Sequence, residues 1–117
     1  MNTYPLPTLR TFHSSHQARD KWQALKILEE ASETVEAAKA CINTNPTDTR
    51  GPYERKQALA DEIADLLQTI VNLCDAYMID PHMLARSADT ITKRNIERGM
   101  FTDGERTRMH RAGECGA

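Results

Sequence analysis

The chain has 117 residues, of which 39% are hydrophobic and 27% charged, and its net charge at neutral pH is −2. These values are typical of one small, soluble, folded domain and exclude a disordered chain. A small negative charge disfavours nucleic-acid binding, which needs a basic surface. Apolar runs fall short of the roughly 20 residues that cross a bilayer, and no signal-peptide pattern is seen. We therefore expect a cytoplasmic protein without nucleic-acid or membrane partners.

Residues 1–17 show no sustained hydrophobic period and are interpreted as an N-terminal arm. From about Ala18 to Ile42, apolar residues recur at spacings of three and four, which predicts a long amphipathic helix. The segment 43–52 contains turn-forming residues and two prolines and should end that helix. A second helical pattern runs from about residue 53 to residue 78.

Asp80 and Pro81 form a helix start, because a capping carboxylate precedes a proline at the first helical position. This third helix should end near residue 98, where Gly99 supplies a stop. The helical domain is thus predicted to span residues 18–101, followed by a polar C-terminal tail over residues 102–117. With few aromatics and no strand pattern, the fold class predicted is an all-α helix bundle.

The apolar face of the second predicted helix is too wide for one neighbouring helix. In projection it covers an arc of roughly 160°. Asp61, Gln68 and Asp75 lie on the opposite side and are interpreted as plain surface. A chain with three helices offers few partners for such a surface, so we expect a homodimer or larger homo-oligomer to complete the bundle.

Two acidic pairs carry the first chemical signal. Glu30 and Glu33 are three residues apart in the first helix, and Glu62 and Asp65 are three apart in the second. Side chains at this spacing share a helix face, so two antiparallel helices could bring four carboxylates around one cavity. Such a cluster repels itself unless a cation lies within it, and oxygen ligands suit Mg²⁺ or Mn²⁺.

The alternative is that these acids are simply the solvated faces of two helices. The position of Glu62 argues against it, because Glu62 projects about 20° from Leu73, at the border of the apolar arc. A carboxylate there needs a partner, since burying an unpaired charge is costly. Neither Glu62 nor Asp65 has a lysine or arginine three or four residues further on. A metal ion is then the plausible partner.

The segments 28–34, 61–67 and 93–99 together resemble the MazG-like all-α nucleoside triphosphate pyrophosphohydrolases. That family has an E-x-x-E pair, a variable spacer and an E-x-x-D pair, followed by a basic segment with Lys, Asn and Arg. Either pair alone is a weak motif, whereas both in order, followed by the basic segment, are fairly specific. The similarity covers about residues 22–99.

The resemblance implies a Mg²⁺-dependent hydrolase, with Mn²⁺ able to substitute, that converts a nucleoside triphosphate to the monophosphate and pyrophosphate. It also implies a homodimer or homotetramer. It assigns Glu29 to activation of the attacking water. Two sets of residues remain: the metal ligands Glu30, Glu33, Glu62 and Asp65, and the triphosphate-facing residues Lys93, Asn95 and Arg98. Without the acid pairs, Lys93, Arg94 and Arg98 would be interpreted as ordinary cations near a helix C-terminus.

Two alternatives remain open. A sister family, the phosphoribosyl-ATP pyrophosphatases, shares both acid patterns but usually has Tyr-His shortly after the aspartate, where this chain has Gln68 and Thr69. That difference and the basic segment favour the nucleoside triphosphate branch. A non-enzymatic helical interaction module is the rival from another class, and it should gain no stability from Mg²⁺.

No clear motif for recognising the base is visible. Phe12, His13, His16 and Trp22 could stack on or hydrogen-bond a base. Packing in the core or an interface is the better explanation of Trp22, and surface exposure is the better explanation of each histidine. Asn72 lies near Asp65 in projection, two turns on, and is a candidate for contacting phosphate or a metal-bound water.

Overall fold

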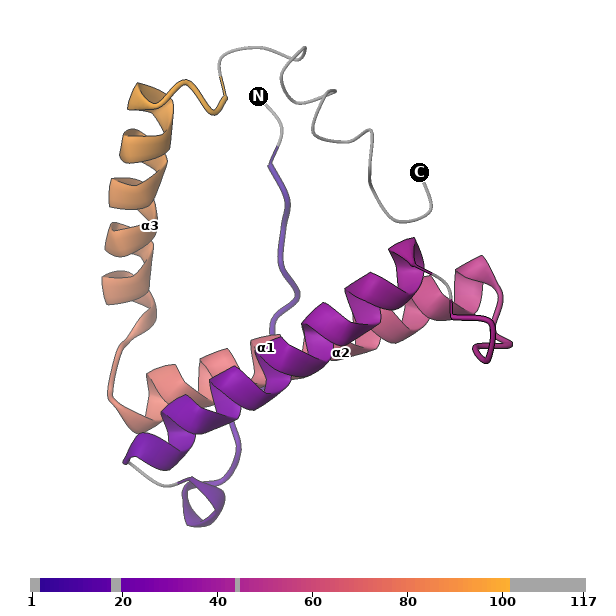
Figure 1. The fold of residues 1–117 in the computed structure, drawn as a ribbon. Helices are drawn as coiled ribbons and strands as arrows, with labels where there is room; N and C mark the ends of the chain where they lie inside the picture. Colours follow the sequence, from indigo (N-terminus) through magenta and orange to yellow (C-terminus); the bar gives the residue numbers. More distant parts are fainter. Residues whose placement is uncertain (1–2, 18–19, 44, 102–117) are drawn as a thin grey trace.

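A computed structural model describes residues 3–17, 20–43 and 45–101. It contains a 3₁₀ turn η1 (Ser14–His16) and the helices α1 (Lys21–Ile42), α2 (Pro52–Ala76) and α3 (Pro81–Glu97), with no strand in the described part (Figure 1). The all-α class predicted from sequence is confirmed. The expected first residue of the first helix, Ala18, and the tail 102–117 lie outside the described residues. None of the described helices combines the length and apolar character needed to cross a membrane.

The helix ends follow from local sequence chemistry. The Asp20 carboxylate accepts a hydrogen bond from Trp22 N at the start of α1, and the Asp80 carboxylate accepts one from Met83 N at the start of α3. These side chains satisfy backbone N–H groups that have no partner within the helix. Gly99 has a φ of 75°, the left-handed conformation that ends a helix. Helix α2 stops two residues before the predicted end because Met78 also takes a left-handed φ, of 57°.

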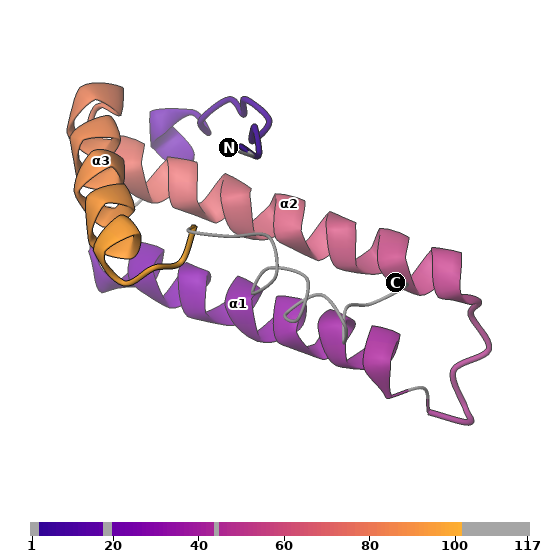
Figure 2. The same cartoon turned by 90° about the horizontal axis from the view of Figure 1, so that it is seen from above.

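Helices α1 and α2 form an antiparallel pair that is packed along its length, whereas α3 makes little contact with either. In Figure 1, α3 follows the end of α2 and projects away from the α1–α2 pair. In Figure 2, α3 lies at one end of that pair. Every residue of α3 except Asn95 is exposed. The third helix therefore does not complete a bundle within one chain.

The described part of the chain buries no hydrophobic side chain. Its two buried residues are both amides, Gln23 in α1 and Asn72 in α2. On α3, Leu84 and Ile91 are about half exposed. A hollow of about 650 Å³, lined mostly by apolar side chains, lies where the N-terminal segment, the end of α2 and the start of α3 meet. A folded helical protein normally covers such surface.

The N-terminal segment lies against the second half of α2 and is held there by three amide side chains. Asn72 Oδ1 accepts a hydrogen bond from Phe12 N at 3.0 Å. Gln68 Nε2 donates to Arg10 O at 2.8 Å, and Gln17 Nε2, in the segment itself, donates to Asp75 Oδ2 on α2 at 3.1 Å. Gln68 is half-buried, so its interpretation as plain surface was wrong. The helical projection considered only helix neighbours, whereas an irregular segment covers this side of α2.

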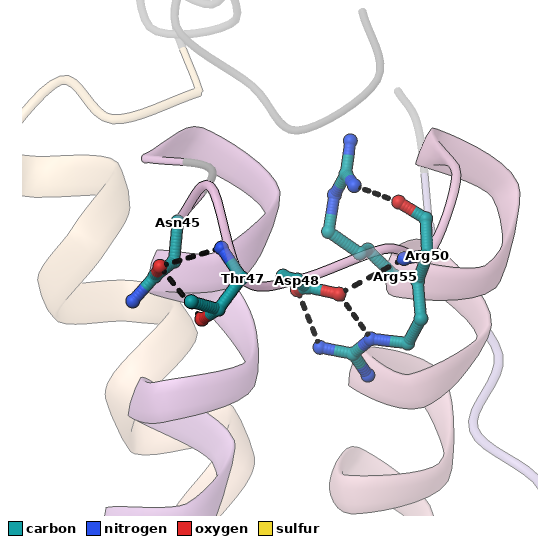
Figure 3. A network of polar contacts seen from close by, with 5 residues as sticks. All are labelled: Asn45, Thr47, Asp48, Arg50 and Arg55. Carbon is teal, nitrogen blue, oxygen red and sulfur yellow. Dashed lines mark hydrogen bonds and ion pairs between the residues drawn. The ribbon is translucent and has the colours of Figure 1, made fainter.

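The α1–α2 loop is held by a compact polar network (Figure 3). The Asp48 carboxylate accepts hydrogen bonds from Arg50 Nε and Arg50 Nη2, both at 2.9 Å, and a third from Arg50 N. These side-chain and backbone hydrogen bonds lower the pKa of Asp48 to about 2. Arg55, in the first turns of α2, donates to Arg50 O. These contacts fix the loop to the first turns of α2, at the end of the helix pair away from α3.

Candidate metal centre

Three carboxylates from two helices meet near the middle of the α1–α2 pair. Glu30 comes from α1, and Glu62 and Asp65 come from α2; one oxygen of each lies within 4.8 Å of the others. The antiparallel pairing of α1 with α2 brings the two i,i+3 acid pairs to the same level. The sequence predicted that four carboxylates would converge if the helices were antiparallel; Glu33, the fourth, is not among the three whose oxygens lie within 4.8 Å of one another.

A threonine marks how closely the two helices approach at this level. Thr34 Oγ1 donates a hydrogen bond within α1 to Glu30 O at 2.8 Å. The same hydroxyl lies 3.3 Å from Glu62 O on α2. A small side chain here lets the helix backbones come together, which places the carboxylates of Glu30 and Glu62 opposite one another. The sequence analysis missed Thr34, whose signal was its position one residue after the first acid pair.

The environment of the cluster raises two pKa values. Burial raises the pKa of the Glu30 carboxyl most, followed by the negative charges of Glu33 and Asp65. Burial also raises the pKa of Glu62 most, followed by a hydrogen bond to Glu33 and the charge of Glu33. Glu33 therefore lies against both Glu30 and Glu62, although its own side chain is exposed.

These carboxylates fit a hard divalent cation. Glu30 Oε2 and Glu62 Oε2 are buried and have no hydrogen-bond partner among the described residues. Buried polar atoms are normally paired, and several like charges at this range repel one another. A cation bound by oxygen ligands would satisfy both atoms and remove the repulsion. Glu30, Glu62 and Asp65 are accordingly the residues that would hold it, and Glu33 as a fourth ligand remains a prediction.

The raised pKa values predict an unusual pH dependence for the metal-free protein. Between the ordinary value of 4.5 and the raised value, folded Glu30 and Glu62 bind more protons than the unfolded chain does. The free energy of unfolding in EDTA should therefore increase as the pH is lowered from 7.5 to 5. Urea denaturation at several pH values measures this. The increase should be smaller in Glu62→Gln, and a stability that instead falls over this interval would contradict the prediction.

Glu29 lies beside the cluster and is not part of it. Its carboxylate pairs with Lys26 Nζ at 3.3 Å, and its side chain is 54% exposed. Lys26 also lies 5.7 Å from the ring centroid of Trp22. The assignment of Glu29 to water activation remains a prediction.

The basic segment lies on α3, away from the acidic cluster of the same chain (Figure 1). Lys93 and Arg98 are exposed and Asn95 is half-buried. Arg98 Nη1 lies 3.3 Å from Asn95 Oδ1, so these two residues share the last turn of α3 as their spacing predicted. The single chain does not bring this basic segment to the carboxylates.

A cavity of about 260 Å³ adjoins the cluster, and Glu30 and Asp65 contribute to its wall. Phe12, His16 and Trp22, three of the residues considered for base contact, also line it, whereas His13 does not. Trp22 is 57% exposed, so it is not part of a core within this chain. Asn72, considered for phosphate contact, lines the cavity too, and its Oδ1 is already bonded to the N-terminal segment. Sequence analysis missed Gln23, a buried amide in the same wall.

Comparison of the sequence with known protein families gives one match. Residues 7–94 match the family model described as phosphoribosyl-ATP pyrophosphohydrolase. Searches of curated proteins and of solved structures gave no significant match. The matched residues include both acid pairs, and members of this family typically depend on divalent metals. The match extends over most of the chain, and we conclude that the protein belongs to the phosphoribosyl-ATP pyrophosphohydrolase family, within the MazG-like all-α superfamily of pyrophosphohydrolases.

Proposed function

We propose that the protein is a Mg²⁺-dependent enzyme that hydrolyses a nucleoside or deoxynucleoside triphosphate to the monophosphate and pyrophosphate. The observation that carries the proposal is the carboxylate cluster of α1 and α2. Two of its oxygens are buried without a partner among the described residues, in a chain whose family consists of pyrophosphohydrolases. A triphosphate approaching such a cluster would be repelled without a cation, so metal and substrate should bind together.

Each residue has a distinct part in this proposal. When bound, a divalent cation supplies neutralisation of phosphate charge and a lowered pKa for a coordinated water. Glu29, at the edge of the cluster, takes the proton of the attacking water as general base. Lys93 and Arg98 hold the triphosphate, and Asn95 orients Arg98 through their mutual contact. The amide nitrogen of Asn72 has no acceptor among the described residues and would donate to substrate from the cavity wall.

We further propose that a second copy of the chain completes the site, in a homodimer or a homotetramer. Helix α3 projects from the α1–α2 pair with Leu84 and Ile91 half exposed. Packing this helix on a second copy would cover its apolar face and carry Lys93 and Arg98 toward the carboxylates of that copy. The apolar hollow at the α2–α3 junction offers a matching surface.

Assembly can be tested directly. The 13.2 kDa chain should elute with twice or four times that mass in size-exclusion chromatography with light scattering. Ile91→Asp, which places a charge on the apolar face of α3, should shift the population toward the monomer. Thr92→Asp, one position along the same helix, is the matched control and should leave the assembly intact. A monomeric wild-type protein at micromolar concentration would contradict the proposed assembly.

A second substrate is favoured by a specific observation, the family match itself, because it names phosphoribosyl-ATP. Against it stand Gln68 and Thr69, at the position where that enzyme group usually has Tyr-His. Both residues line the cavity beside the cluster, so the difference falls at the proposed site. We therefore place ordinary nucleoside triphosphates first and phosphoribosyl-ATP second.

One assay separates the two substrates. Purified protein with Mg²⁺ or Mn²⁺ is incubated with the ribo- and deoxynucleoside triphosphates and, separately, with phosphoribosyl-ATP, and pyrophosphate and orthophosphate are measured. Pyrophosphate release from at least one common triphosphate is the expected result. Turnover of phosphoribosyl-ATP alone would support the second candidate, and release of orthophosphate alone would exclude both.

A further inference from the structure

The hydroxyl of Thr34 reaches the main chains of both helices that carry the carboxylate cluster. Thr34 Oγ1 donates to Glu30 O at 2.8 Å within α1 and lies 3.3 Å from Glu62 O on α2. A hydroxyl has one proton, which is shared here between a short hydrogen bond and a longer, weaker one. Both carbonyl groups belong to residues whose carboxylates meet in the cluster. The hydroxyl therefore links the main chains of two candidate ligands, one from each helix.

Two other helical threonines show what is particular to Thr34. Thr90 Oγ1 donates to Arg86 O at 3.1 Å in the same i to i−4 pattern, but Thr90 is exposed on α3, which makes little contact with α1 or α2. Thr69 Oγ1 donates to Leu66 O at 2.7 Å, within its own helix. A bond to the preceding turn is common for a helical threonine. Of these three hydroxyls, that of Thr34 also reaches a neighbouring helix.

The neighbours of Thr34 on the same face of α1 are small. Ala31 and Ala38 lie one turn to either side and are half-buried, like Thr34 itself. Figure 2 shows α1 and α2 side by side. The distance between two packed helices depends on the side chains at their contact, so small residues allow a close approach. At the level of the carboxylates, the side chain that contacts the opposite main chain is Thr34.

The separation of the two helices decides which cation the cluster can hold. Glu30 comes from α1, and Glu62 and Asp65 come from α2, so the distances between their oxygens follow the helix separation. Mg²⁺ binds oxygen ligands at about 2.0–2.1 Å and needs a nearly octahedral arrangement, whereas Ca²⁺ accepts oxygens at about 2.3–2.6 Å in flexible geometries. A small increase in helix separation would therefore weaken Mg²⁺ binding much more than Ca²⁺ binding.

We propose that Thr34 is a positioning residue that fixes the separation of the two ligand-bearing helices and thereby makes the cluster selective for Mg²⁺ over Ca²⁺. The inference rests on the metal centre of the proposed function and deepens it. Thr34 contacts neither the ion nor the substrate in this role. Its hydroxyl acts through the main chains of Glu30 and Glu62, which it holds together.

The test replaces the hydroxyl of Thr34 by a methyl group in Thr34→Val, which keeps the size and charge of the side chain. Metal-free full-length protein is titrated with MgCl₂ and, separately, with CaCl₂ by isothermal titration calorimetry. The affinity for Mg²⁺ should fall about tenfold, as expected for a residue that orients metal ligands, and the affinity for Ca²⁺ by no more than about twofold. The ratio of the two affinities should thus fall at least about fivefold. A purely structural defect would weaken both ions alike.

Three further variants complete the experiment. Thr34→Ser keeps the hydroxyl and should keep the wild-type ratio of affinities. Thr90→Val removes the same intrahelical hydrogen bond from exposed α3 and should also keep that ratio. Thr34→Ala removes the hydroxyl without placing a methyl group against Glu62 O, and it should lower the ratio; it takes the place of Thr34→Val if that variant does not fold. Circular dichroism verifies the helices of each variant.

The outcomes separate this role from the proposed activity. An unchanged ratio in folded Thr34→Val, or in Thr34→Ala if the first variant does not fold, would overturn the role of Thr34 and leave the metal centre standing. A ratio that falls equally in Thr34→Ser would also overturn it, because the hydroxyl would not be the cause. A wild-type protein that binds neither ion would refute the metal centre and the inference together. The expected shift without pyrophosphate release would support the role of Thr34 and refute the proposed hydrolysis.

Discussion

Replacing Glu62 with Gln is expected to lower pyrophosphate release by more than about 100-fold while the helices stay folded. This exceeds the 10–100-fold typical of residues that only orient a metal ligand. The substitution removes one negative charge from a cluster in which Glu30, Glu33 and Asp65 repel Glu62. The metal-free variant should therefore be at least as stable as the wild type, with a lower gain in Tm on addition of Mg²⁺.

Steady-state rates and thermal denaturation with and without Mg²⁺ measure both effects. The matched control is Asp61→Asn, since Asp61 is the adjacent carboxylate on α2, is exposed and contacts Gln57 outside the cluster. The charge of Asp61 is the smallest of the causes that raise the pKa of Glu62, so this variant should change the rate and the stabilisation by Mg²⁺ far less than Glu62→Gln does. Activity of Glu62→Gln near that of the wild type would remove Glu62 from the site.

Replacing Glu29 with Gln should separate proton transfer from metal binding. A general base typically contributes ~10²–10⁴-fold, so kcat should fall by that amount while stabilisation by Mg²⁺ is largely retained. The Lys26 contact of Glu29 is an exposed i,i+3 pair, so its loss should change the free energy of unfolding by only ~0.2–0.5 kcal/mol. Measured kcat and the Mg²⁺-induced change in Tm report the two properties separately.

The chain contains a closely matched control for Glu29. Glu36, on the same helix, pairs with Lys39 at 3.3 Å, again as an exposed i,i+3 pair. Glu36→Gln should cost similar stability and leave turnover unchanged. If Glu29→Gln lost Mg²⁺ stabilisation as fully as Glu62→Gln, Glu29 would be a ligand, and an unchanged kcat would make it a surface residue.

Features encoded within a few residues could be predicted from the sequence. The start of α3 depends on Asp80 and Pro81, and its end depends on Gly99, all of which act within one helical turn. The meeting of Glu30 with Glu62 and Asp65 needed only two i,i+3 spacings and an antiparallel hairpin. A loop with two prolines between long amphipathic helices makes that hairpin the simplest arrangement.

Features that depend on irregular backbone could not be predicted in this way. Gln68 projects away from the apolar arc of α2, and only the path of the N-terminal segment shows that Arg10 covers it. Gln23 carries no pattern that distinguishes it from an exposed helical glutamine, although it is buried. The direction of α3 depends on the turn at Met78, which takes a left-handed φ. A methionine does not predict that conformation, because glycine is the residue that favours it.

The absence of buried hydrophobic side chains in the described part of the chain has a consequence for folding itself. Apolar burial is the main favourable contribution to folding, and apolar residues of α2 such as Leu66, Ile70 and Val71 are only half-buried, so the α1–α2 pair gains only part of that contribution in isolation. If association supplies that burial, folding becomes second order in protein, and the unfolding midpoint rises with concentration. Dilution would then increase the unfolded fraction of the protein. A newly synthesised chain would reach its full stability only after it associates with a second chain.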